Sequence, residues 1–190
     1  IATVFVSSCY IASVQFIPVG VAVLVFFTFP VIIAVSSPLV ERRRPSLAQI
    51  ALALLAFAGV GISIGPQFAG LDGRGLLLAA LSALGCALQF FSGRMLAGHI
   101  APAPFGALVH LAILPMVLMI MLWAGGGEMQ ILTPDVSMTT KFAVALVGIS
   151  YCAAYFLQMS SVAQAPASVV APYFNLEPVV TTVIAVILLG

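Results

Sequence analysis

Charge is the scarcest property of this sequence. Its 190 residues include six basic and five acidic side chains, so 6% of the residues are charged, whereas a soluble domain has about 25%. Apolar residues make up 63% of the chain, and the mean hydropathy is +1.28. So few charges cannot cover a surface that faces water, which excludes a soluble fold. The net charge of +1 also argues against a nucleic-acid partner.

Cysteine is scarce as well. The three cysteines, Cys9, Cys86 and Cys152, all fall inside apolar runs. Their spacing matches neither a disulfide framework nor a metal site, so we interpret them as small packing residues. The sequence predicts no metal site and no cofactor.

Long apolar runs fill most of the chain. Each is about 17–24 residues long, which is enough to cross a hydrocarbon core of about 30 Å. We therefore predict an all-α, polytopic membrane protein. Seven spans are expected, at residues 1–17, 19–40, 47–64, 75–97, 104–124, 141–164 and 167–189. Because both ends of the sequence lie in apolar runs, we interpret the chain as a fragment truncated at both ends.

Basic residues in short loops predict the orientation. Arg42, Arg43 and Arg44 follow the second span, and such residues favour the cytoplasmic side. Alternation of the spans then places Arg94 and His99 on that side too. We expect a multi-pass protein of the bacterial inner membrane with the loop of Arg42–Arg44 in the cytoplasm.

The sequence repeats itself at a long offset. The same offset separates three pairs, Pro18 and Pro166, Phe26 and Phe174, and Pro30 and Pro178. This offset spans five predicted helices, an odd number, so equivalent helices must cross the membrane in opposite directions. Such inverted repeats are typical of transporters, whose sites lie near the midplane where the repeats meet. We predict a helical bundle built from two inverted five-helix repeats.

The predicted organisation follows from this offset. Residues 1–64 would be the last three helices of the first repeat, and residues 65–74 the connecting loop. Residues 75–190 would be the first four helices of the second repeat.

Short motifs in both units resemble a known family. The second unit contains Ala165-Pro-Ala-Ser-Val-Val170, Leu176-Glu-Pro-Val179 and Leu188-Leu-Gly190, and the first contains Ile17-Pro-Val19, Phe29-Pro30 and Glu41. In this order they resemble the EamA-type repeat of the drug/metabolite transporter superfamily. The resemblance implies ten spans, of which the third to ninth would be present, and a carrier of metabolites, amino acids or toxic compounds. The first unit departs from the pattern because Phe29 stands where the second has Glu177.

Glu177 is the strongest candidate for a functional residue. It lies near the middle of the last span, where a charged side chain costs about 2.5–3.5 kcal/mol on insertion scales. Helical spacing places Tyr173, Glu177 and Thr181 on one stripe. Two interpretations stay open. Glu177 either carries a coupling proton or binds a substrate amine, or it is a hydrogen-bonded structural carboxyl that stabilises a kink.

Three prolines predict breaks in the helices. Proline has no backbone N–H and clashes with the carbonyl one turn earlier. Pro172 and Pro178 should therefore bend or unwind the last span close to Glu177, and Pro30 should do the same in the second span.

A polar stripe recurs on equivalent helices. In the sixth span it consists of Tyr151, Tyr155 and Gln158, and in the first span it includes Ser7 and Tyr10. A polar stripe that faced lipid would serve no purpose, so we expect both to line a pathway. The alternative is hydrogen bonding between helices.

Two further spans hold isolated polar candidates. Gln89 in the fourth span is a candidate cavity residue. His110 in the fifth span is a functional candidate because an ionisable residue inside a membrane is costly. A buried histidine bonded to a carbonyl is an equally good interpretation.

The sequence thus predicts a secondary transporter, not an enzyme. It would work by alternating access, the family resemblance implies export of small metabolites or amino acids, and coupling to protons through Glu177 is one of the two interpretations of that residue. Its partners would be a small-molecule substrate and the lipid bilayer, with a homodimer left open. A structural membrane subunit is the main alternative. An intramembrane hydrolase built on Ser150 and His110 is disfavoured, because Tyr151 replaces a glycine expected there and the repeat would be unexplained.

Overall fold

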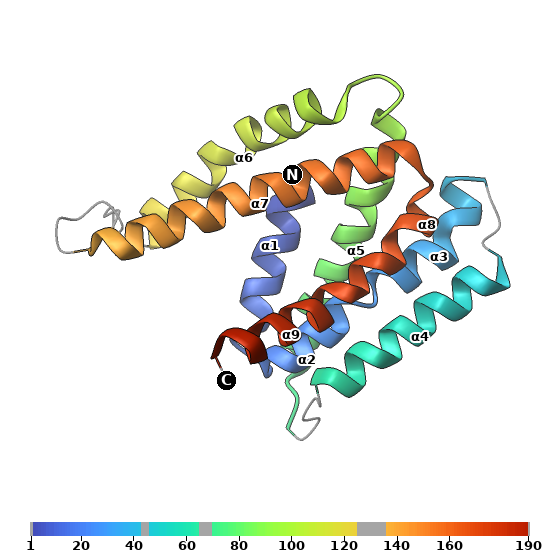
Figure 1. Cartoon of the computed structure of the whole chain (residues 1–190), viewed down its shortest axis with the longest axis horizontal. Helices are drawn as coiled ribbons and strands as arrows, with labels where there is room; N and C mark the ends of the chain where they lie inside the picture. The colour runs from blue at the N-terminus through green and yellow to red at the C-terminus, as the bar shows by residue number, and fades with distance from the viewer. Residues whose placement is uncertain (1, 43–45, 65–69, 125–135, 190) are drawn as a thin grey trace.

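The computed structural model describes residues 2–42, 46–64, 70–124 and 136–189, and the regular structure in these ranges is helical. Figure 1 shows α1 (Ala2–Ser13), α2 (Val19–Phe26), α3 (Phe29–Val40), α4 (Leu47–Ile64), α5 (Gly73–Leu96), α6 (Pro102–Ala124), α7 (Met138–Gln164), α8 (Ala167–Val170), the 3-10 helix η2 (Ala171–Leu176) and α9 (Glu177–Leu189). The predicted all-α membrane bundle is confirmed. Residues 65–69 of the predicted loop at 65–74 lie outside the described residues, and so do Arg43 and Arg44.

Four segments in the described ranges are long and apolar enough to cross a membrane. They are Val19–Val40, Gly73–Leu96, Pro102–Met119 and Met138–Gln164. Ala2–Ser13 and Leu47–Gly59 are shorter apolar helices. The predicted span at 167–189 is not one helix, because it is divided into α8, η2 and α9. Its prolines explain this division, because proline has no N–H to continue the α-helical hydrogen bonds.

Helix α5 lies at the centre of the packing, and α1 runs along it (Figure 1). Small residues on α5 allow this close approach. A Cβ atom added at Gly85 would lie only 2.9 Å from Cγ2 of Val6. The Ser82 hydroxyl donates a hydrogen bond of 2.9 Å to the Val6 carbonyl, so the two helices are joined by a polar contact as well as by packing.

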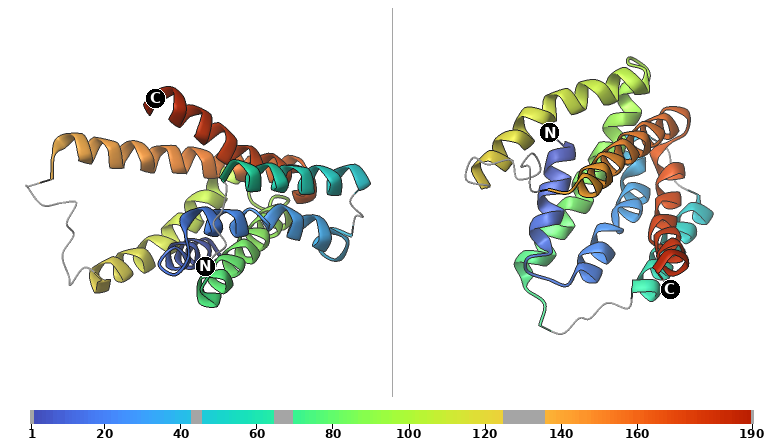
Figure 2. Two further views of the ribbon diagram at one scale, coloured as in Figure 1. Left: turned by 90° about the horizontal axis from the view of Figure 1, so that it is seen from below. Right: turned by 60° about the vertical axis from the view of Figure 1, so that its left-hand side comes forward.

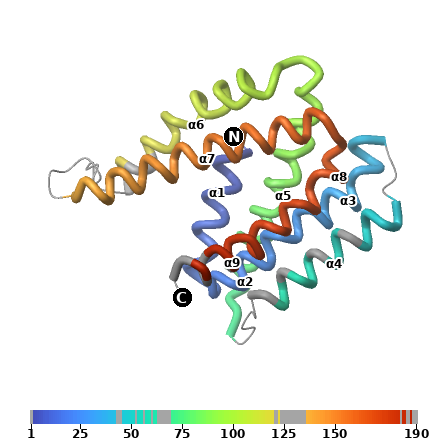
Figure 3. The backbone as a smooth tube through the Cα atoms, in the orientation of Figure 1, coloured from blue at the N-terminus to red at the C-terminus, as the bar shows by residue number. Residues whose placement is uncertain are grey.

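Two broken helices cross the bundle in opposite directions. Figures 1 and 3 show α2 and α3 running one way and α8, η2 and α9 running back. Each begins after a proline of nearly the same conformation, with φ −55° and ψ 140° at Pro18 and φ −55° and ψ 145° at Pro166. These features support the inverted repeat, which we retain as a proposal.

Helices α6 and α7 run in roughly opposite directions and diverge from each other as they extend to one side of the bundle (Figures 1 and 2). Most of their described side chains are exposed and apolar. Such a surface is suited to contact with lipid or with other apolar helices rather than with water.

Several helix termini lie close together at one end of the bundle. Arg94, near the end of α5, donates from Nη1 to the carbonyls of Val162 at 3.2 Å and Ala163 at 2.7 Å, at the end of α7. A positive charge there suits the negative end of the helix dipole. Arg42 follows α3 at the same end of the bundle, where the end of α3 meets the start of α8. The structure therefore places Arg42 and Arg94 on one side.

Candidate functional site

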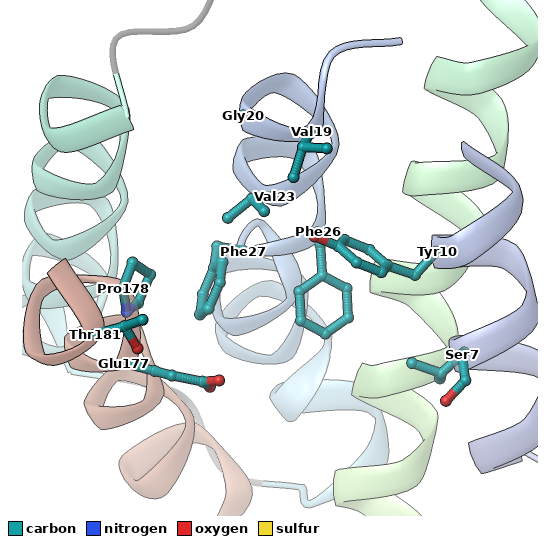
Figure 4. Close-up of a pocket in the computed structure, with 11 residues that line it drawn as sticks. Ser7, Tyr10, Val19, Gly20, Val23, Phe26, Phe27, Glu177, Pro178 and Thr181 are labelled. Carbon is teal, nitrogen blue, oxygen red and sulfur yellow. The ribbon is translucent and has the colours of Figure 1, made fainter. Parts of the chain in front are cut away.

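The break before Glu177 positions its side chain. Pro178 has no N–H to donate to the Phe174 carbonyl, so an α-helix cannot continue through this point. The Phe174 carbonyl instead accepts a hydrogen bond from the N–H of Glu177, which closes the tighter turn of η2. Glu177 is therefore the first residue of α9, and its side chain is exposed and points into a cavity (Figure 4).

The other broken helix has its gap at the equivalent place. Helix α2 ends at Phe26 and α3 begins at Phe29, with Pro30 in its first turn. Phe29 and Pro30 are almost completely buried, and Phe26 and Phe27 reach the cavity that Glu177 faces (Figure 4). The two breaks therefore meet near the middle of the bundle, at this cavity.

Two adjoining cavities, of about 550 Å³ and about 300 Å³, surround Glu177. Both are lined by Val6, Ser7, Phe26 and Glu177. The larger is further lined by Tyr10, Val19, Gly20, Val23, Phe27, Pro178 and Thr181. The smaller is further lined by Thr3, Phe29, Cys86, Gln89, Phe90, Tyr151, Ala154, Tyr155, Gln158 and Phe174.

The structure brings most of the predicted site residues together. Glu177, Thr181, Tyr10 and Ser7 line the larger cavity. Tyr151, Tyr155, Gln158 and Gln89 line the smaller one. These side chains come from α1, α5, α7 and α9, so four helices face one space. Their roles in transport remain proposals.

Tyr173 does not join this group. Its side chain is 69% exposed and lies outside the lining of both cavities. The predicted stripe of Tyr173, Glu177 and Thr181 assumed an α-helix, in which residues four apart share a face. A 3-10 helix has three residues per turn, so Phe174 shares the face of Glu177 instead. Phe174 lines the smaller cavity.

His110 lies behind the tyrosines rather than in the two cavities. Its ring packs edge-on against Tyr155, with centroids 4.7 Å apart, and against Tyr151 at 5.7 Å. His110 Nδ1 is 2.7 Å from the Gly106 carbonyl, which makes Nδ1 the donor. Nε2 is buried without a hydrogen-bond partner. The carbonyl contact fits the structural interpretation, but His110 also lines a further cavity of about 370 Å³ together with Thr3, Ser7 and Tyr151, so both interpretations of His110 stay open.

Tyr155 on α7 lies between α1 and α5 in the lining of the smaller cavity. The side chains of Thr3 on α1 and Gln89 on α5 line the same cavity beside it. Tyr155 is only 5% exposed, so its side chain is shielded from lipid. The polar stripes predicted for the first and sixth spans meet at this cavity, which Ser7 lines together with Tyr151, Tyr155 and Gln158.

The described lining of the site carries negative charge only. Among the described residues, Glu177 is the only charged side chain that lines either cavity, and no lysine, arginine or histidine accompanies it. Aromatic rings cover much of the wall. Phe90 packs edge-on against Phe174 with centroids 5.2 Å apart, and tilted against Phe29 at 5.4 Å. A carboxylate among aromatic faces can bind a positively charged group.

The aromatic wall was not predicted from the sequence. Phe26, Phe29, Phe90 and Phe174 lie in apolar runs that also hold many residues facing lipid, so nothing local marks them. The offset that pairs Phe26 with Phe174 is the signal that could have identified two of them.

Comparison with known proteins identifies the family. The model of the EamA-like transporter family matches residues 73–190. The chain belongs to the EamA-like transporter family. No curated protein and no solved structure matches the chain. The resemblance expected from the motifs is thereby confirmed, and the chain is a multi-pass membrane protein of a transporter family.

Proposed function

We propose that this EamA-like protein is a secondary carrier of the bacterial inner membrane that exports small metabolites or amino acids by alternating access. The observation that supports this most is the position of Glu177. A single carboxylate begins a half-helix at a break and faces cavities that are lined by both broken helices and by α1, α5 and α7. Binding sites of transporters are typically formed by such discontinuous helices near the midplane.

The chemistry of the lining favours a substrate with an amino group. Glu177 would bind the ammonium group, and the faces of Tyr10, Tyr151 and nearby phenylalanines would contact the rest of the molecule. A polyanionic substrate would find no cation among the described lining residues. In the same site Glu177 can exchange its proton for the substrate, which would couple transport to protons.

An enzymatic function is not supported by the geometry. An intramembrane hydrolase would need Ser150 activated by His110, yet His110 packs against Tyr151 and Tyr155. Within the described residues, no hydrogen bond joins Ser150 to His110. Nucleophilic catalysis requires such a contact or one that substrate binding readily completes.

Substrate flux tests the proposal. Full-length protein reconstituted in liposomes is expected to move labelled amino acids or amines from a mixed pool faster than protein-free liposomes do. A structural membrane subunit predicts no flux. It also predicts that a cysteine at Thr181 stays unreactive to a water-soluble thiol reagent, whereas the carrier predicts rapid labelling at this position. Absence of both flux and labelling would contradict the proposal.

A further inference from the structure

The end of α3 fixes the position of Glu41. The Glu41 N–H donates to the Ser37 carbonyl at 2.8 Å, which completes the last turn. Arg42 then adopts a left-handed conformation with φ 53°, which ends the helix. The carboxylate of Glu41 therefore leaves α3 at a defined point, at the end of the bundle where α8 begins.

Glu41 contacts the start of α8, which is 126 residues away in the chain. Its Oε1 accepts a hydrogen bond of 2.8 Å from the Ala167 N–H, and its Oε2 accepts one of 3.2 Å from the Ser168 hydroxyl. The residue before α8 is Pro166, whose side chain makes no capping bond. Glu41 thus supplies from another helix the cap that α8 cannot supply for itself.

This contact joins the two broken helices at one end only. Ala167 and Ser168 are buried, and none of Glu41, Ala167 and Ser168 lines either cavity around Glu177. The end of α3 and the start of α8 are therefore held together near Arg42, and the Glu41 carboxylate is the charged group that bridges them.

The opposite end of the same helices is arranged differently. The larger cavity extends from Glu177 to Val19 and Gly20 at the start of α2 (Figure 4). Val19 is 60% exposed, and Pro18 before it makes no side-chain capping bond. Pro18 and Pro166 have nearly the same backbone angles, yet among the described residues a carboxylate caps only the helix after Pro166.

From this asymmetry we infer that Glu41 is a gate residue. Its contact with Ala167 and Ser168 closes the substrate pathway at the Arg42 end while the cavity extends toward the other end. Breaking the contact separates the end of α3 from the start of α8 and opens the pathway on the Arg42 side. Glu41 acts by positioning these helices and does not touch the substrate. The inference depends on the alternating access of the proposed function.

Accessibility of Cys86 from each face of the membrane tests this inference. Cys86 lines the smaller cavity. In full-length protein with its other cysteines, including Cys9 and Cys152, replaced by alanine, a small membrane-impermeant methanethiosulfonate reagent is added to one face of sealed vesicles. We expect Glu41→Ala to raise the rate of Cys86 labelling from the Arg42 face by about five-fold or more.

Asp72→Ala provides the matched control. Asp72 Oδ1 accepts a hydrogen bond of 2.8 Å from the Arg74 N–H and caps α5. This variant also loses a carboxylate cap, but that cap is local to the start of α5 and does not join two helices. It should label like the wild type from both faces. Ser168→Ala removes one of the two Glu41 contacts and should raise labelling from the Arg42 face less than Glu41→Ala does.

The outcomes separate the gate from a merely structural role. Faster labelling from the Arg42 face together with slower labelling from the other face supports the gate. Unchanged labelling in Glu41→Ala overturns it, and so does an equal increase from both faces, which indicates a loosened fold. If Glu41→Ala does not reach the membrane, Ser168→Ala decides by the same criteria. The labelling needs no substrate, so a protein without measurable flux can still show the gate, and flux without the labelling change would reject only the gate.

Discussion

Among single residues other than Glu177, substitution of Tyr155 tests the candidate site most directly. The Tyr155 side chain lines the smaller cavity together with those of Thr3 and Gln89, and a hydrogen bond among such groups or to a substrate typically contributes about 1 kcal/mol net. We expect Tyr155→Phe to raise the KM for substrate flux in liposomes by roughly five-fold or more. Tyr173→Phe is the matched control, because Tyr173 is 69% exposed and outside the cavities. Equal KM values for Tyr155→Phe and the wild type would show that this hydroxyl does not shape the site.

The residues of the candidate site were predictable where helical spacing is regular. Tyr151, Tyr155 and Gln158 lie on one face of the continuous helix α7, and all three line the smaller cavity. The prediction failed at Tyr173 because the chain there is a 3-10 helix. Prolines in a sequence predict that a helix is interrupted, but they do not predict whether the helix bends, unwinds or becomes a 3-10 helix. That choice depends on packing with distant helices.

At the scale of the element, the close approach of α1 and α5 should limit the size of side chains. A Cβ at Gly85 would lie 2.9 Å from Val6 Cγ2 and 3.0 Å from Phe5 Cδ1. Such overpacking typically destabilises by about 1–3 kcal/mol, so Gly85→Ala should lower the Tm of the protein in detergent. Gly148→Ala on α7 is the control, since a Cβ there meets nothing within 4 Å. An unchanged Tm in Gly85→Ala would argue against this packing.

The break at Pro178 gives a second prediction for an element. In Pro178→Ala the new N–H can bond the Phe174 carbonyl, which favours a straight helix through Glu177. We expect the maximal rate of substrate flux to fall several-fold, with a smaller change in KM. Pro115 lies inside the continuous helix α6 and outside both cavities, so Pro115→Ala serves as the control. Equal losses in both variants would mean that the break at Pro178 has no special role.

For the whole molecule, the proposed orientation places Arg42 in the cytoplasm and Arg74 on the other side. Both residues are exposed in the structure, and short loops rich in arginine favour the cytoplasmic side. A single cysteine at Arg42 should react with an impermeant reagent only from the cytoplasmic face, and one at Arg74 only from the opposite face. The reverse pattern would contradict the proposed orientation.

The sequence predicted more of the overall architecture than of its long-range contacts. Composition and run length yielded the all-α membrane bundle and the approximate helix positions, because the bilayer fixes how long an apolar helix must be. The contact of Glu41 with Ala167 was not predicted. It joins segments far apart in the chain, and its only sequence signal is a helix that starts after Pro166 without a capping side chain of its own.

Proton movement in liposomes tests the central claim most directly. Full-length protein is reconstituted with a trapped pH dye, and a pool of amino acids and amines is added to the wild type and to Glu177→Gln. If Glu177 couples transport to protons, the wild type will show substrate-evoked proton movement and Glu177→Gln will lose it while remaining folded. Equal proton movement in both proteins would contradict this role and would leave Glu177 as a structural group at the start of α9.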